Sequence, residues 1–541
     1  MKRIHWYDHL SINLFWLGLN IRNTAVGSVF MPYLVAIFVR PDIKNTALGG
    51  MNTAGLIIAM LVQPLAGLLS DRSTSRFGRR RPFIFFGVIF DLVFLAAIGL
   101  SGSYSFLLVA ILFQQFSANV SHGPLQGLIP DLVPEDQRGR SAGVKAIFEL
   151  LPLIIIPFTI AKLVESGNMS WAVVSTGAGL LLIMLLTMFF VKEQPLKEKP
   201  TTSLREPMMR VLGILSGICV GAAVGLLAGG ILGGLGYLIA QLFVSIGIAQ
   251  MIGISLFGAI AMIVAVVVGV WAGSLASLGH DRGSITGLWI GLLLGIVVFL
   301  VTWYLSTVGI GLGIGIITCG ITTLIVALIV DARYKMFPTL REDASLNSNF
   351  TWWVVNRLLF LAAVTSIQRF AMYFIMSAFG VSPEKGVGMS TQLIMVVGIF
   401  TIVSALLGGI LSSKFGNKRL VSISGIVAFG GTLLLLVTTI IPNLMVMYVA
   451  GIIIGLGAGL FMTTNWALGT ALAPGKEAGR YLGISNLAGA GAGMIGTGIG
   501  GPVADLINRI QPGMGYFVIF ACFAILFGLS TVSLLKIKKD N

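Results

Sequence analysis

Long apolar stretches recur along the whole of this chain, and they constrain its fold more than any other feature. The 541 residues are 56% hydrophobic and only 10% charged. A stretch of about 20 apolar residues can span a bilayer as a helix, whereas a water-soluble core has no room for so much apolar surface. The sequence therefore predicts an all-α polytopic membrane protein. The predicted spans cover residues 10–38, 47–70, 82–102, 105–130, 141–164, 170–191, 350–379, 388–412, 420–440, 444–470, 481–505 and 514–536.

Basic residues between these spans lie almost entirely on one side. The loop 71–81 carries five Arg, and Lys and Arg recur on every second loop after it, whereas the loops near residues 101 and 441 carry almost none. By the positive-inside rule, we expect both termini and the Arg-rich loop to face the cytoplasm of a multi-pass cell-membrane protein. These loops account for the net charge of +15 without a nucleic-acid partner. No cleavable signal peptide is expected, because no small-residue cleavage site follows the first stretch.

Two motifs occur twice in the chain at almost the same offset. LVPEDQRGRSAG at 132–143 returns as LAPGKEAGRYLG at 472–483, and GLLSDR from Gly67 returns as GILSSK from Gly409. A six-helix unit is therefore repeated in parallel. Such a repeat predicts two bundles, residues 1–191 and 345–541, which rock against each other around a solute site near the membrane midplane.

Residues 192–344 separate the two bundles and match neither repeated motif. Glycines recur at every fourth position from Gly213 to Gly233, which gives a helix face that favours close packing. Because both ends of this segment are expected on the cytoplasmic side, the number of inserted helices is even. The two uncharged runs, 211–278 and 284–330, favour about four. The Gly-rich segment is either an oligomerisation face or a spacer, which leaves a monomer and a weak oligomer both open.

Two strings carry a resemblance to a known family. SDRSTSRFGRRR (70–81) resembles the signature loop of the major facilitator superfamily, and more narrowly that of plant-type sucrose–proton symporters and the related glycoside–pentoside–hexuronide cation symporters. NVSHGPLQGLIPDL (119–132) matches the sucrose-symporter pattern at Asn119, Gly123, Pro124, Asp131 and Leu132. Those symporters carry an Arg two residues after the Gly-Pro pair, where this chain has Gln126.

The resemblance implies a major facilitator fold of two parallel six-helix halves, here with about four extra helices inserted between them. It also implies a secondary transporter that moves a small polar solute, such as a sugar or glycoside, by alternating access with coupling to H⁺ or Na⁺. An exporter of an amphiphilic solute is the first alternative. A non-transporting membrane sensor or scaffold is a second alternative, although no long hydrophilic segment offers it a signalling domain.

The Arg-rich loop carries more charge than topology alone requires. The resemblance implies that it is a conformational latch, and Asp71 at the end of the span 47–70 can accept hydrogen bonds from a loop Arg or a helix N-terminus. The alternative is a solvated charge run that only signals topology. The expected latch residues are Gly67, Asp71, Arg72, Gly78, Arg79 and Arg80.

Polar and ionisable residues inside the spans are candidates for a solute or coupling site, because they are costly in a membrane. Asp91 is either a coupling carboxylate or the partner of an internal Arg, and Glu149 is either a coupling carboxylate or the partner of Lys145. His122 can titrate near neutral pH or simply pack, and an amide beside an indole suits a hydroxyl-rich ligand. The candidates are Arg22, Asn23, Asp91, Asn119, His122, Gln126, Glu149, Arg357, Arg369, Asn465, Trp466 and Asn486.

Nothing in the sequence indicates an enzyme. There is no HExxH motif and no CxxC pair, and the Gly-rich strings lack the strand–helix context of a nucleotide site. The three Cys lie inside apolar runs and are expected to pack there. We therefore expect no catalytic residue, no metal site and no cofactor other than the coupling ion. The expected partners are the lipid bilayer and a small-molecule solute.

Overall fold

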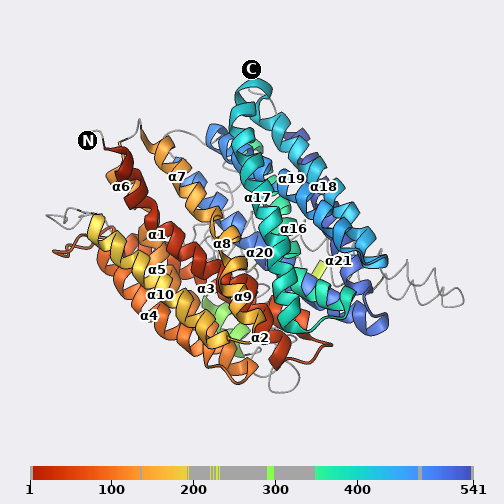
Figure 1. The fold of residues 1–541 in the computed structure, drawn as a ribbon. Coiled ribbons are helices and arrows are strands. Elements are labelled where there is room, and N and C mark those ends of the chain that lie inside the picture. Colours follow the sequence, from red (N-terminus) through yellow and green to blue (C-terminus); the bar gives the residue numbers. More distant parts are fainter. Residues whose placement is uncertain are drawn as a thin grey trace, which may run out of the picture. The chain divides into compact units, whose positions relative to one another are not determined.

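A computed structural model describes residues 4–134, 137–191, 193, 348–472 and 478–537, with short pieces between 220 and 297. Within these ranges every regular element is a helix (Figure 1). The predicted inserted helices of 192–344 lie almost wholly outside the described residues.

The first six predicted spans are all helical. Span one is continuous, because a π-helical segment joins two α-helices without a break. The spans at 105–130 and 141–164 are each divided, and Pro124, Pro152 and Pro157 lie in or next to the divisions, where the missing N–H interrupts the helical hydrogen bonds. The elements are α1 (Trp6–Thr24), η1 (Ala25–Phe30), α2 (Met31–Phe38), α3 (Lys44–Ser70), α4 (Arg81–Gly99), α5 (Tyr104–Gln126), α6 (Leu128–Leu132), α7 (Arg138–Leu150), α8 (Pro152–Phe158), α9 (Ile160–Glu165) and α10 (Met169–Phe190).

The last six predicted spans are also helical. Their elements are α16 (Ser348–Phe379), α17 (Pro383–Phe415), α18 (Asn417–Ile440), α19 (Leu444–Leu472), α20 (Ala478–Ile510) and α21 (Met514–Ser533), followed by a short 3-10 turn, Leu534–Lys536. Among the described residues, eleven helical stretches are long and apolar enough to cross a membrane, and α20 covers the remaining predicted span. The all-α polytopic membrane fold predicted from the sequence is thereby confirmed.

The helices form two compact units. Unit 1 contains Met1–Pro41, Ala54–Ser203 and Gln368–Val403, and unit 2 contains Asp42–Thr53, Leu204–Ile367 and Ser404–Asn541. Each unit therefore takes a segment from the opposite half of the sequence. The predicted repeat boundaries, 1–191 and 345–541, remain a prediction from the repeated motifs.

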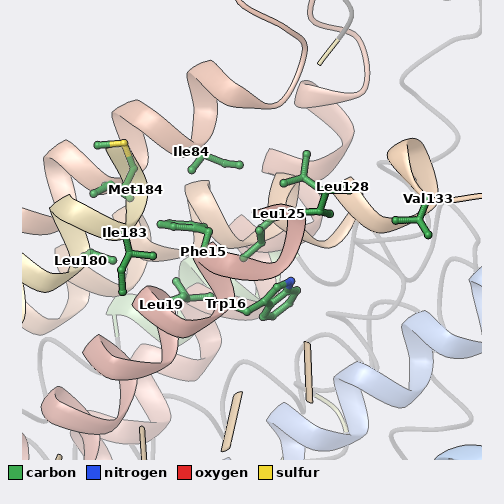
Figure 2. Close-up of a cluster of buried hydrophobic side chains, with 12 residues drawn as sticks. Phe15, Trp16, Leu19, Ile84, Leu125, Leu128, Val133, Leu180, Ile183 and Met184 are labelled. Atoms are coloured by element: carbon green, nitrogen blue, oxygen red, sulfur yellow. The ribbon is translucent and has the colours of Figure 1, made fainter. Parts of the chain in front are cut away.

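An apolar cluster in unit 1 packs α1 against its neighbours (Figure 2). Phe15, Trp16 and Leu19 project from α1 and are at most 3% exposed. They meet side chains of α4, α5, α6 and α10, and α10 in turn packs on α4. The surrounding members are Ile84, Leu125, Leu128, Leu180, Ile183 and Met184.

Unit 2 has an aromatic core where α16, α19 and α21 meet. The ring of Phe360 stacks on Phe461 with centroids 3.6 Å apart and meets the edge of Phe527 at 4.8 Å. All three side chains are completely buried. This packing fixes the register of α16 against α19, and α16 and α19 carry four of the predicted site residues.

Candidate functional site

A buried ion pair lies among α1, α4 and α5. The Nε of Arg22 is 3.0 Å from Oδ2 of Asp91, and the two side chains are 2% and 1% exposed. Gln114 donates from Nε2 to the other carboxylate oxygen at 2.9 Å. Arg22 also donates to Oδ1 of Asn23 at 2.6 Å. Of the two alternatives for Asp91, the structure shows the partner of an internal Arg, and Gln114 is a partner that the sequence did not indicate.

A second polar group surrounds Trp16 in the same unit. The Nζ of Lys145 lies 4.1 Å from the Trp16 ring centroid, and His122 meets that ring edge-on at 5.3 Å. Lys145 also lies 3.4 Å from Oε1 of Glu149, the pairing expected of residues one helical turn apart. Both members of this pair are about one-third exposed.

Among the described residues, the remaining candidates in α5 and α20 form no hydrogen bond with the Arg22–Asp91 pair or with the group around Trp16. Asn119 is buried and bonds to Gln115 of its own helix, at the backbone carbonyl. Gln126 is exposed at the end of α5. The side chain of Asn486 lies outside the described residues.

In unit 2 the candidates Arg357, Asn465 and Trp466 lie together. Nη1 of Arg357 donates to Oδ1 of Asn465 at 3.0 Å. The guanidinium carbon is 5.3 Å from the ring centroid of Trp466 and 5.8 Å from that of Trp353. The three residues come from α16 and α19, so helix packing assembles a cation, an amide and two indole faces at one place.

The amide of Asn465 is held rigidly. It donates from Nδ2 to Oδ1 of Asn356, which itself donates to the carbonyl and the hydroxyl of Ser530, each at 2.8 Å. Trp353 donates from its indole N–H to the Asn465 carbonyl at 2.8 Å. Asn465 is completely buried, so its amide orients Arg357 and is not itself open to solvent.

Arg369 lies in unit 1, although it belongs to α16. Its Nη1 donates to the carbonyl of Gly27 in the π-helical segment η1. A Cβ at position 27 would lie 2.2 Å from that nitrogen, so only glycine leaves room for the contact. One turn further along α16, Tyr373 donates to the Pro32 carbonyl at 2.9 Å. Arg369 is therefore engaged with backbone, a contact that the sequence pattern did not reveal.

The loop between α3 and α4 forms a charged cluster centred on Arg80. This side chain donates to Asp71 at 2.7 Å, to Asp131 of α6 at 2.5 Å and to the Pro124 carbonyl at 3.2 Å. Arg79 also pairs with Asp131. Arg80 is buried, whereas Asp71 is 48% exposed. The expected hydrogen bond from a loop Arg to Asp71 is present, and Arg80 makes it.

Two glycines make the close approach around this loop possible. Gly78 has a φ of +104°, in the left-handed region that other residues rarely adopt. A Cβ on Gly127 would fall 1.9 Å from the guanidinium carbon of Arg80. Gly67 faces the Gly123 carbonyl, which lies 3.7 Å from where its Cβ would be.

Glu193 is a member of this cluster that the sequence did not single out. It follows α10 and accepts backbone hydrogen bonds from Arg80 at 2.8 Å and Arg81 at 3.3 Å, at the start of α4. Burial raises the pKa of its carboxyl, and these hydrogen bonds and the Arg charges oppose that shift. The sequence suggested that Asp71 could accept hydrogen bonds from a helix N-terminus. Glu193 is the carboxylate that does so at the start of α4.

Asp505 of α20 is another functional candidate missing from the predicted set. Its carboxylate accepts hydrogen bonds from Nδ2 of Asn45 at 2.7 Å and from the Thr46 amide at 2.6 Å, at the start of α3. Tyr516 donates to Oδ1 of Asn45 at 3.3 Å, and Asp505 itself is 3% exposed. Because loop 71–80 follows the other end of α3, this contact lies at the opposite end of that helix.

The sequence is similar to a known protein family and to known transport proteins. The family model described as Major Facilitator Superfamily matches residues 17–337 and 332–497. A sucrose transport protein of Arabidopsis thaliana is 28% identical over 185 residues, which is 27% of this chain and 31% of that protein. The general alpha-glucoside permease of Schizosaccharomyces pombe is 25% identical over 186 residues, covering 30% and 33% of the two chains. The chain thus spans about a third of the length of these relatives.

Solved structures show the same fold over almost the whole length. A peptide transporter of the POT family, in complex with sulfate, aligns with a TM-score of 0.59 at 12% identity and covers 99% of this chain and 95% of that one. A nucleoside transporter aligns with a TM-score of 0.55 at 12% identity, covering 98% and 100%. At these identities the likeness concerns the fold alone.

Proposed function

This chain belongs to the Major Facilitator Superfamily, and from that premise we propose that it is a secondary transporter of a sugar or glycoside. The relatives named above are a sucrose transport protein and an alpha-glucoside permease, and neither is named as an enzyme. The observation that carries the proposal is the set of polar and ionic groups buried within apolar helices. Such groups are costly in a membrane and typically mark a solute or ion pathway.

Contacts between the two sequence halves, at α2 and at the start of α3, support alternating access. In unit 2, Asp505 of the second sequence half binds the start of α3 from the first half. In unit 1, Tyr373 of the second half binds the Pro32 carbonyl of the first half. With the Arg-rich loop in the cytoplasm, these contacts hold the two halves together on the extracellular side. They must open when the protein exposes its site to that side.

Asp505 is expected to stabilise this extracellular contact. The variant Asp505→Asn loses the charge and turns an NH₂ group toward backbone donors, and hydrogen bonds to a charged group contribute about 1.5–3 kcal/mol. We expect a cysteine introduced by Thr53→Cys, in a background free of native Cys, to react with a maleimide about tenfold faster in this variant, equivalent to about 1.4 kcal/mol.

The neighbouring pair Arg509–Asp42 provides the control for that measurement. Its side chains are 52% and 38% exposed, and exposed pairs contribute about 0–1 kcal/mol. Arg509→Gln should leave the labelling rate close to that of the parent. Equal labelling rates in Asp505→Asn and the parent would show that the carboxylate does not hold the contact closed.

For ion coupling, the Arg22–Asp91 pair is the best-placed group in unit 1. The carboxylate is buried, and its charge is balanced by Arg22 alone among the cations that the structure describes near it. If solute binding draws Arg22 away, a proton or Na⁺ can neutralise Asp91 in its place. Glu149, which is partly exposed and paired with Lys145, is the alternative coupling carboxylate.

Solute counterflow in proteoliposomes tests the transport proposal directly. Vesicles containing the purified protein are loaded with an unlabelled sugar or glycoside, and entry of the same labelled compound is followed without any ion gradient. Exchange of at least one member of a panel of mono- and disaccharides and glycosides is the expected result. Absence of exchange for the whole panel, together with exchange of amphiphilic solutes, would favour the exporter alternative.

A further inference from the structure

The segment η1 (Ala25–Phe30) is the one π-helical element among the described residues, and it lies inside the first membrane span. In a π-helix each N–H bonds to the carbonyl five residues earlier, and the Met31 N–H accordingly bonds to the Val26 carbonyl. The next donor along the helix would be Pro32, which has no N–H. The carbonyl of Gly27 is therefore left without a donor from its own helix.

Arg369 supplies the missing donor. It lies on α16, in the second half of the sequence, and its Nη1 donates to the Gly27 carbonyl. Because an added Cβ at position 27 would fall 2.9 Å from the guanidinium carbon, the side chain packs directly on the glycine. This contact between the sequence halves thus uses a carbonyl that the π turn leaves free.

Pro32 leaves one carbonyl unpaired whether the helix is π or regular α at this place. In a regular α-helix each N–H reaches four residues back, so the Met31 N–H would bond to Gly27. Pro32 would then leave the Ser28 carbonyl without a donor instead. Since neither form pairs every carbonyl, a donor to Gly27 from outside the helix can select the π form.

A change between these two forms would turn α2 relative to α1. The apolar cluster of unit 1 holds α1 in place, and removing the extra residue of a π turn rotates the following helix by about 100°, the share of one residue in an α-helical turn. The Pro32 carbonyl of α2 accepts from Tyr373 at 2.9 Å, and Tyr33 of α2 donates to Glu384 of α17 at 3.3 Å. Rotation of α2 would break both contacts with the second half.

We propose that η1 is a two-state hinge of the extracellular contact and that Arg369 selects its closed form. Arg369 on the Gly27 carbonyl keeps the π turn and holds α2 against α16 and α17. When Arg369 leaves, the Met31 N–H takes the Gly27 carbonyl, the helix becomes regular and α2 turns away. This inference rests on the proposed alternating access and adds the element of the first span that performs it.

A cysteine on α2 reports this change. Tyr33 is 8% exposed and faces Glu384, so Tyr33→Cys, in a background free of native Cys, should react with a membrane-impermeant maleimide chiefly when α2 has turned. Arg369→Gln should raise the labelling rate at least about tenfold, as expected for the loss of a hydrogen bond from a charged group. Gly27→Ala should do the same through its Cβ, and it tests the hinge even if Arg369→Gln fails to fold. The control Gly179→Ala adds a Cβ that meets no atom within 4 Å and should leave the rate unchanged.

Pro32→Ala distinguishes a two-state hinge from a fixed π turn, because the two predict opposite changes. The alanine N–H completes the pairing of the regular α-helix, so a two-state hinge should open more readily and label about tenfold faster. In a fixed π turn the new N–H would instead donate to the Gly27 carbonyl, stabilise the closed form and slow the labelling.

The outcomes separate the hinge from the transport function on which it rests. Slower or unchanged labelling in Pro32→Ala, or parent-like labelling in both Arg369→Gln and Gly27→Ala, would overturn the hinge while leaving sugar transport standing. The labelling needs no solute, so it still decides on the hinge if counterflow fails with every compound and the proposed transport is itself overturned.

Discussion

Asp91→Asn is expected to lower the free energy of unfolding by about 3–5 kcal/mol, because it leaves the Arg22 guanidinium buried without its counter-ion. The pair is almost completely buried, and Gln114 completes its hydrogen bonding. Reversible unfolding of the purified protein in mixed detergent–dodecyl sulfate micelles measures the loss. If enough protein survives to reconstitute, we also expect ion-driven solute accumulation to be abolished while counterflow persists.

The double variant Arg22→Met/Asp91→Leu separates stability from function. Replacing both members of a buried pair with apolar side chains removes the uncompensated charge and is often close to neutral for stability. It should recover most of the stability lost in Asp91→Asn but none of the accumulation. The control Glu149→Gln breaks the pair with Lys145, in which each side chain is about one-third exposed, and should cost less than about 1 kcal/mol. A fully stable, fully coupled Asp91→Asn protein would refute this role for the pair.

Arg80→Gln is expected to give the second largest effect, a fall in transport turnover of tenfold or more. Arg80 joins Asp71, Asp131 and the Pro124 carbonyl, and charge-assisted hydrogen bonds of this kind contribute about 1.5–3 kcal/mol each. Their loss weakens one end-state of the transport cycle and leaves the solute-binding residues untouched. Initial counterflow rates and equilibrium solute affinity, measured together, should show slower turnover at nearly unchanged affinity.

Three further variants locate that effect. Gly127→Ala should reproduce it, because its new methyl group would overlap the Arg80 guanidinium. Asp71→Asn should fold and insert normally and slow transport less, since Asp71 is half exposed and Arg80 keeps Asp131. Arg76→Gln changes an exposed Arg of the same loop, whose guanidinium lies over the ring of Phe77. Its transport turnover should equal that of the parent. Parent-like turnover in Arg80→Gln would reduce the loop to a topology signal.

The sequence predicted the helices well, because the apolar runs that a bilayer requires are long and continuous. It also indicated the loop 71–81 as a charged cluster, since five Arg beside Asp71 stand out against apolar flanks. It did not give the arrangement within the loop. Which of the five Arg is buried depends on the left-handed turn at Gly78 and on the space beside Gly127, and both depend on tertiary packing.

The candidate sites were harder to predict because their partners come from distant helices. Asp91 and Arg22 each stand out as charges inside spans, but only the folded structure, in which α1 and α4 both pack on α10, shows that they pair. Asn465 looked like a ligand for a hydroxyl group, and the structure shows its amide bonded to Asn356 and Arg357. Its role toward a solute stays a prediction.

Asp505 and Glu193 were missed for a related reason. Each lies at the edge of a predicted span, where an acidic residue is ordinary and attracts no notice. Their importance comes from the helix N-termini that they face, α3 for Asp505 and α4 for Glu193. An acidic residue at the end of a span can cap the N-terminus of a neighbouring helix. The positions of Asp505 and Glu193 in the sequence were consistent with this role.

Ion-driven accumulation tests the central claim, cation-coupled solute transport, most directly. Proteoliposomes are given a tenfold inward gradient of H⁺, or separately of Na⁺, with the membrane potential clamped at zero so that the charge of the solute does not matter. A tenfold gradient supplies about 1.4 kcal/mol per ion, so one of the two ions should drive the solute identified by counterflow to several times its external concentration. Entry that stops at equal concentrations under both gradients would contradict coupling.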